Sequence, residues 1–192
     1  LDTLFVRRAY LTNWMAVRDA LNSFRARGIT RRIGVSVYTP DEARTAIGAD
    51  GVDVIQLPAN VLDRRFEEAD IFARAAEFGI AVVIRSAFLQ GLLLMDPEHI
   101  PGHLASARPY VETLASIVVT HSCTRLALLL GYLRQRHPKA DVIVGAETPQ
   151  QVKALADAWR MELSHDALNQ LHGAFRDVPH VLLDPTQWPV PV

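Results

Sequence analysis

The sequence predicts an α/β fold whose parallel sheet forms part of a (β/α) barrel of TIM type. Short apolar segments alternate with amphipathic helical segments along the 192 residues, which is typical of βα units. Three of the apolar segments end in a polar residue, at Ser36, Gln56 and Arg85. The carboxyl ends of parallel strands meet at one rim, where barrels carry their sites.

The chain holds about five of the eight βα units of a complete barrel, which needs roughly 250 residues. No GxGxxG motif follows the first apolar segment, and GxxxxGK[ST] occurs nowhere. Because these are the usual nucleotide-binding signals of open doubly wound sheets, their absence favours the barrel.

The expected strands are short apolar runs bounded by polar or turn-forming residues. They cover residues 1–7, 33–37, 52–57, 81–84 and 141–145. The fourth run follows Gly79 and is uninterrupted up to Arg85. A continuous run of this kind predicts a strand that is covered on both faces.

The expected helices show the three-to-four-residue apolar spacing and recognisable ends. They cover residues 14–27, 40–48, 67–78, 111–119, 123–137, 149–159 and 164–175. The second begins after Thr39, a good N-cap, with Pro40 in its first turn and two acids behind it. Thr148 and Pro149 open the sixth in the same way.

We expect one partial-barrel domain over residues 1–176 and a proline-rich C-terminal tail over residues 177–192. The tail contains four prolines and is expected to be irregular. The chain opens on Leu1 within a strand-like segment, which suggests that it is part of a longer protein.

Composition excludes several classes of function. A formal charge of −1 and a pI near 6.7 argue against nucleic acid and against a polybasic membrane surface. No apolar run reaches the roughly 18 residues of a membrane helix. The single cysteine, Cys123, predicts a buried structural thiol in a reducing, cytoplasmic compartment. The seven histidines show no HExxH spacing, so no metal site is expected.

Five motifs, read in order, resemble the later part of the aldo-keto reductase family, from its fourth strand onward. They are LDTLFV at 1–6, IGVSVY at 33–38, DVIQLP at 53–58, RSAFLQGLLLM at 85–95 and VIVGA at 142–146. The combination of RSAFLQGLLL with QLPANVLDRR is most similar to bacterial members found with surface-polysaccharide genes. The resemblance implies NAD(P)H-dependent reduction of a carbonyl of a small molecule or sugar, with NADP(H) or NAD(H) as cofactor.

The resemblance also implies a cofactor site. Ser36 and Gln56 match the residues that hold the nicotinamide carboxamide, and a hydroxyl and an amide can serve both ends of that group. Arg85 stands where an aromatic residue usually stacks on the nicotinamide, and its planar guanidinium can also stack. Two alternatives stay open. Ser36 could satisfy backbone groups at a strand end, and Arg85 could form an ion pair with Asp63 or a neighbouring carboxylate.

Two loops complete the implied cofactor site. Ser86, Leu89, Gln90 and Gly91 would line the pyrophosphate path, and Gly145, Ala146 and Thr148 lead into a helix N-terminus that favours phosphate. Gln151 falls at or near the family's arginine for the adenosine 2′-phosphate, so the sequence gives only weak support for NADP over NAD.

The catalytic residues of the family are not identified in this chain. Its histidine position holds Arg7, or Arg8 if the register shifts by one, and its Asp, Tyr and Lys come from strands that would precede Leu1. We therefore expect the isolated 192 residues to be inactive. Two hypotheses remain: part of a reductase, or a noncatalytic binding or regulatory module of the same fold.

A partial barrel also has consequences for association. Its first and last strands have open edges, and open edges pair with other chains. We expect a homodimer or pairing with the missing barrel strands, besides a small-molecule carbonyl substrate.

Overall fold

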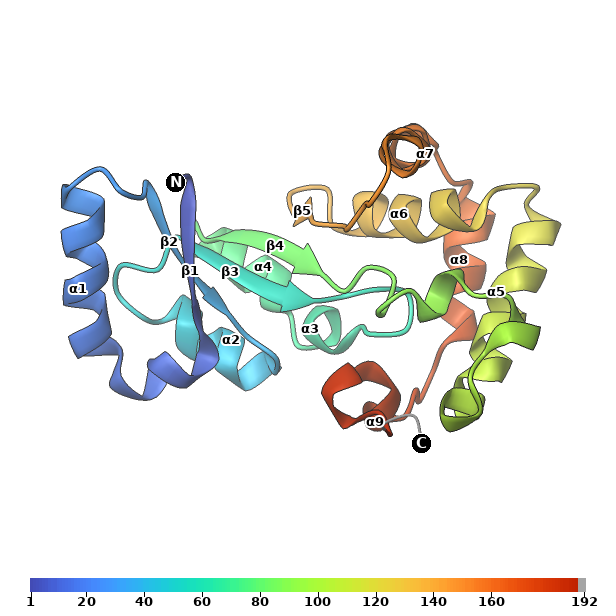
Figure 1. Cartoon of the computed structure of the whole chain (residues 1–192), viewed down its shortest axis with the longest axis horizontal. Helices are drawn as coiled ribbons and strands as arrows, with labels where there is room; N and C mark the ends of the chain where they lie inside the picture. Colours follow the sequence, from blue (N-terminus) through green and yellow to red (C-terminus); the bar gives the residue numbers. More distant parts are fainter. Residues whose placement is uncertain (190–192) are drawn as a thin grey trace. The chain divides into compact units, whose positions relative to one another are not determined.

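A computed structural model describes residues 1–189, and the chain divides into two compact units (Figure 1). The sheet unit consists of Leu1–Ala59, Arg64–Arg85 and Lys139–Ile143. The helical unit consists of Asn60–Asp63, Ser86–Pro138 and the described residues from Val144 onward. Each unit is described by itself below.

The sheet unit is built on a five-stranded parallel sheet whose strands follow one another in chain order. The strands are β1 (Thr3–Arg7), β2 (Arg32–Ser36), β3 (Val54–Pro58), β4 (Ala81–Arg85) and β5 (Asp141–Val142). This order confirms the alternation of strands and helices that the sequence predicts. Residue 143 onward lies outside β5, so the prediction of a strand over 141–145 was too long.

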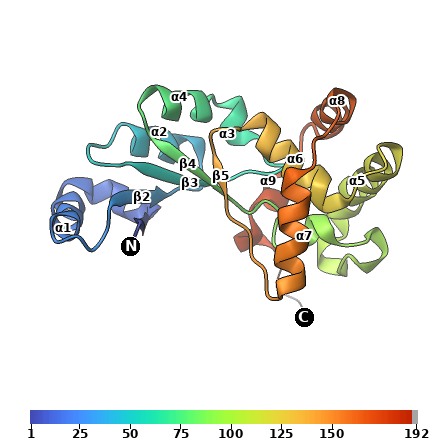
Figure 2. The same cartoon turned by 90° about the horizontal axis from the view of Figure 1, so that it is seen from above.

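The two faces of this sheet differ sharply. Ile33, Val35, Ile55, Leu57 and Ile84 point to one face and are completely buried. Helices α1 (Trp14–Ala26), α2 (Pro40–Ile47) and α4 (Ile71–Glu77) contact β2, β3 and β4 respectively, and Figure 2 shows α2 and α4 on the same side of the central strands. Residues that alternate with the buried set face the other way.

The second face carries the polar residues and is only partly covered. Phe5 lies against Gly34, and a side-chain carbon added at Gly34 would come within 2.5 Å of the Phe5 ring. Ser36, Gln56 and Arg85, further along the same face, are half-buried. In a closed barrel this face would line the interior.

The expected helix over 67–78 is two helices, so that prediction was wrong. Short α3 (Arg65–Glu68) and α4 are separated by Asp70, whose φ of 56° is left-handed. Phe66 and Ile71 are both completely buried. A spacing of five residues would place them roughly 140° apart on one continuous helix, and the break lets both reach the core. Aspartate is among the residues that tolerate this conformation.

The helical unit contains α5 (Arg108–Thr120), α6 (Arg125–Arg136), α7 (Pro149–Arg160) and α8 (His165–Ala174). The tail is not wholly irregular, because α9 (His180–Leu183) and a 3-10 turn at Pro185–Gln187 lie within it. Leu182 and Leu183 are buried, so this segment packs against the core and is not a free tail. Residues 190–192 of the expected tail lie outside the described residues.

No single helix in residues 1–189 has the length and apolar composition to cross a membrane. The segments Gly102–Thr120 and Arg125–Arg136 pass that test only as a pair, and they are bent by 92° at the break between them.

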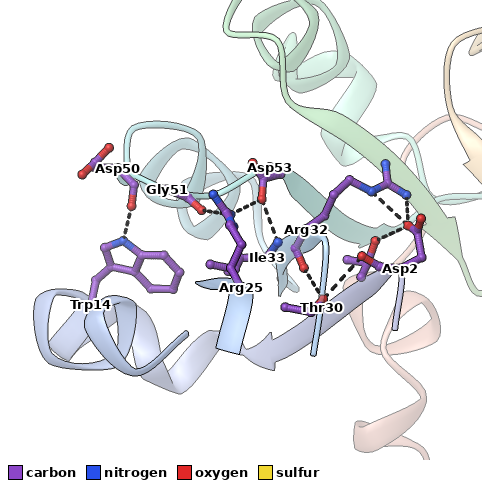
Figure 3. Close-up of polar contacts among 10 residues, drawn as sticks. Asp2, Trp14, Arg25, Thr30, Arg32, Ile33, Asp50, Gly51 and Asp53 are labelled. Carbon is purple, nitrogen blue, oxygen red and sulfur yellow. Dashed lines mark hydrogen bonds and ion pairs between the residues drawn. The ribbon is translucent and has the colours of Figure 1, made fainter. Parts of the chain in front are cut away.

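A polar network anchors α1 to the amino ends of the strands (Figure 3). The Asp53 carboxylate accepts hydrogen bonds from the Arg25 guanidinium and from the Ile33 backbone N–H, at 2.7 Å for the latter. Arg25 also donates to the Gly51 carbonyl, at 3.2 Å. At the other end of α1, the Trp14 indole N–H donates to the Asp50 carbonyl, at 2.8 Å. Asp53 therefore has a structural role in this network.

We expect Asp53→Ala to lower the free energy of unfolding by about 2 kcal/mol, because it leaves a backbone N–H and a guanidinium without their acceptor. Urea denaturation measures this loss. Asp50→Ala is the matched control: its carboxylate is 84 % exposed in a surface ion pair with Arg18, and the backbone acceptor of Trp14 is retained. Surface pairs of this kind contribute about 0–1 kcal/mol. Equal losses in the two variants would contradict the assignment.

Candidate functional site

The centre of the candidate site is a hydrogen-bonded pair at the carboxyl ends of β2 and β3. Ser36 Oγ donates to Gln56 Oε1 at 3.0 Å, and the two residues are direct neighbours in the parallel register. The Gln56 amide nitrogen makes no hydrogen bond to any residue in the described part of the chain. The pair therefore presents an amide donor and a hydroxyl oxygen side by side on the open face of the sheet.

Tyr38 follows β2 and lies between two arginines. The Arg85 guanidinium carbon is 4.1 Å from the centre of the Tyr38 ring, and that of Arg8 is 4.6 Å from it. Arg85 also donates to the Val37 carbonyl at 3.3 Å. Stacking on an aromatic ring restrains each guanidinium and stabilises it. The planar group at position 85 thus stacks in this structure on Tyr38, while its predicted stacking on a nicotinamide stays a prediction.

Tyr38 was not among the site residues predicted from the sequence. Tyr38 lies two residues beyond the end of β2, and its contacts with Arg8 and Arg85 join residues far apart in the sequence. Pro58 pairs with Arg85 in the register, which places the ends of β3 and β4 in the same layer.

The register distinguishes between Arg7 and Arg8. Arg7 is paired with Ser36, which in turn is paired with Gln56, so all three side chains leave the sheet on one face. Arg8 lies beyond the strand and forms an ion pair with Glu42 at 3.1 Å. Of the two arginines, Arg7 is the one that shares a row with Ser36 and Gln56.

The loop after β4 has an unusual backbone. Ser86, Leu89 and Gln90 have φ values of 60°, 48° and 56°, and Gly91 follows with 86°. Left-handed conformations cost L-residues roughly 1–2 kcal/mol each, and such strain concentrates at functional sites. Leu89 is almost completely buried and holds the loop in place, whereas Gln90 is exposed.

Asn60 positions the start of this loop and was also missed from the sequence. Its side-chain oxygen accepts from the backbone N–H groups of Leu62 and Asp63, at 2.9 and 3.0 Å. Its side-chain nitrogen donates to the Ser86 carbonyl at 3.1 Å. Asn60 is 1 % exposed, so these bonds stabilise a buried amide and fix the Ser86 backbone.

The predicted phosphate corner, residues 145–151, contains a complete capping box. Thr148 Oγ1 accepts from the Gln151 backbone N–H at 3.2 Å. Gln151 Oε1 accepts in return from the N–H groups of Thr148 and Glu147, at 3.2 and 2.6 Å. Gly145 and Ala146 precede this box and are exposed. Gln151 therefore serves here as a helix cap, and it uses donors that a phosphate would otherwise take.

We expect Gln90→Gly to raise the free energy of unfolding by about 0.5–1 kcal/mol, because glycine adopts the left-handed conformation without steric cost. Thermal or urea denaturation measures this gain in the free energy of unfolding. Gln150→Gly is the control, since Gln150 is equally exposed but lies in the first turn of α7 and should lose stability. A loss of stability in both variants would contradict the strain assigned to the loop.

The Cys123 thiol is partly covered, and this burial raises its pKa above the ordinary value. A raised pKa lowers the thiolate fraction at pH 8, and the thiolate is the reactive form. We expect iodoacetamide to alkylate Cys123 more slowly than free cysteine at pH 8, with the rate rising as the pH is increased further. A rate equal to that of free cysteine at pH 8 would show that burial does not protect this thiol.

The chain belongs to the aldo/keto reductase family, whose model matches residues 7–175. This match confirms the family resemblance, and four of the five sequence motifs lie within the matched residues. It also agrees with a partial α/β barrel, because the solved structures described next share the fold.

Comparison with individual relatives shows what share of their length this chain covers. It is 24 % identical over 179 residues to the NADH-specific methylglyoxal reductase of Escherichia coli strain K12, and covers 55 % of that protein. The holo form of aldo-keto reductase AKR11C1 from Bacillus halodurans has a TM-score of 0.74 at 22 % identity, covering 93 % of this chain and 62 % of that chain.

The aldo-keto reductase MGS-M4, from a Medee basin deep-sea metagenome library, has a TM-score of 0.66 at 15 % identity, covering 91 % of this chain and 60 % of that chain. The chain thus spans a little more than half the length of the curated relative and about three fifths of the solved structures.

Proposed function

We propose that this chain is the nicotinamide-binding part of an NAD(P)H-dependent oxidoreductase that reduces the carbonyl group of a small molecule or sugar. The observation that carries the proposal is the hydrogen bond from Ser36 to Gln56 at the rim of the sheet. Membership of the aldo/keto reductase family supports it.

The Ser36–Gln56 pair fits a carboxamide chemically. The Gln56 amide nitrogen can donate to the carboxamide oxygen, while Ser36 Oγ can accept from the carboxamide nitrogen. Because the two residues are bonded to each other and half-buried, they are already ordered before a ligand binds. Preorganised groups of this kind lose little conformational entropy on binding.

The remaining assignments follow the family resemblance and are part of the proposal. Arg85 of the sheet unit would flank the nicotinamide. In the helical unit, the cofactor-binding residues would be Ser86, Leu89, Gln90, Gly91, Gly145, Ala146, Thr148 and Gln151. The strained backbone of residues 86–91 supports a binding role for that loop.

The nicotinamide, when bound, supplies the hydride for carbonyl reduction. The residues of this chain would bind and orient it. Proton donation requires a general acid, and we assign none within the 192 residues. We infer that the family's Asp, Tyr and Lys lie in sequence outside this chain, and that the isolated chain is inactive.

The capping box favours NADH over NADPH. A 2′-phosphate is best held by an arginine, but position 151 has a neutral glutamine whose side chain is bonded to two backbone N–H groups. The relative from E. coli is named as NADH-specific, which agrees with this preference.

A noncatalytic binding or regulatory module is the second candidate. The observation that favours it is Arg7 in place of the histidine, since no histidine lies anywhere in the sheet unit. Either function leaves β1 and β5 as the open edges of the described sheet. We propose that the missing barrel strands, or a second copy of the chain, pair with them. A cytoplasmic location stays a prediction.

We expect the chain to bind NADH saturably, and Gln56→Ala to weaken this binding about tenfold, because a hydrogen bond to the carboxamide is lost. Nicotinamide fluorescence or calorimetry measures it, with NADPH titrated in parallel. Gln56→Glu, which replaces the amide donor with an acceptor, should weaken binding at least as strongly.

The control variant is Asn22→Ala, which removes an exposed amide from α1 and should leave NADH binding unchanged. Absence of NADH binding, or NADH binding that survives both Gln56 substitutions, would refute the cofactor role assigned to the pair.

A further inference from the structure

We propose that Arg7 makes the site selective for carbonyl compounds that carry a carboxylate next to the carbonyl, that is, for α-keto acids. This inference rests on the proposed function, because it takes the Ser36–Gln56 pair as the place where the nicotinamide is held.

Arg7 lies beside that pair. It closes β1 and pairs in the parallel register with Ser36, which pairs with Gln56. Neighbouring strands are about 4.8 Å apart, so the Arg7 backbone is one strand spacing from Ser36 and two from Gln56. The three side chains leave the sheet on the same face. A ligand bound over Ser36 and Gln56 therefore has the Arg7 side chain as its neighbour on the β1 side.

The Arg7 guanidinium is free to bind a ligand. Arg7 is exposed, and within residues 1–189 its side chain has no hydrogen-bond or ion-pair partner. The adjacent arginine contrasts with it, since Arg8 is held by the Glu42 carboxylate and by the Tyr38 ring. Glu42 is itself engaged as the capping residue of α2 and accepts from the Tyr38 N–H at 2.7 Å.

The side chain at this position is a cation that is rich in donors. All seven histidines of the chain lie between residues 99 and 180, outside the sheet unit. A guanidinium with five N–H donors suits an anion better than a neutral carbonyl oxygen.

The anion is best a carboxylate on the carbon next to the carbonyl. A carboxylate and a guanidinium match as two planar forks that form parallel hydrogen bonds. With the nicotinamide carboxamide on the Ser36–Gln56 pair, the reacting carbonyl would lie next to the nicotinamide ring, and a group attached directly to that carbonyl would be the nearest to Arg7. A phosphate on a longer arm is therefore the poorer fit.

Pyruvate and methyl pyruvate test this inference, because they share the same ketone and differ in the charge of the neighbouring group. In a ¹⁵N-labelled chain, the Nε–Hε signal of Arg7, assigned by its loss in Arg7→Lys, should shift saturably with pyruvate. Methyl pyruvate should bind about tenfold more weakly, as expected for loss of a charged hydrogen bond.

Variants at two positions show whether pyruvate binding depends on Arg7 itself or only on the net charge of the chain. Arg7→Gln should abolish pyruvate binding, measured by saturation-transfer NMR, and Arg7→Lys should keep part of it. Arg27→Gln removes the same charge from an exposed position just after α1 and should bind pyruvate normally. Equal binding of pyruvate and methyl pyruvate, or equal effects of Arg7→Gln and Arg27→Gln, would overturn the inference.

Two further outcomes are decisive. Arg7-dependent binding of hydroxyacetone phosphate without binding of pyruvate would overturn the assignment to α-keto acids. NADH binding by the unmodified chain, measured separately, tests the proposed cofactor site independently of the proposed role of Arg7. If NADH binds through Gln56 but pyruvate does not bind through Arg7, the inference fails while the proposed cofactor site stands.

Discussion

The parallel register of the sheet determines which side chains can act together. Arg7 and Ser36 are 29 residues apart in the sequence, and Ser36 and Gln56 are 20 apart, yet the three residues form one row across three strands. A shift of one residue in any strand would turn its side chain to the opposite face. The buried face prevents such a shift, because it would expose Ile33, Val35 or Ile55 to water.

The side chains at the two ends of the sheet differ in their hydrogen bonding. At the amino ends, the Asp53 carboxylate accepts from Arg25 and from the Ile33 backbone N–H, while the buried Arg25 Nε has no hydrogen-bond partner among the described residues. At the carboxyl ends, Gln56 and Arg7 retain donor groups that no residue of the described chain accepts. This asymmetry is what a barrel requires, since stability is concentrated at one end and ligand contacts at the other.

The strands, most helices and the placement of Ser36 and Gln56 at one rim of the sheet could be predicted from the sequence because they follow from local patterns. Apolar runs and caps such as Thr39 with Glu42 depend on residues within a few positions of one another. The break at Asp70 could not be predicted in this way, because it arises from burying both Phe66 and Ile71 in one core. The roles of Tyr38 and Asn60 depend on residues brought close only by the fold.

The open face of the sheet links the fold to the function. Ser36 and Gln56 are only half-buried there, so water competes for the hydrogen bonds that a cofactor would make. Strands added at the edge of β1 would close the barrel, lower the local dielectric and strengthen the same bonds without changing a residue of this chain. Coverage of this face would therefore strengthen any hydrogen bonds that a ligand makes to Ser36, Gln56 and Arg7.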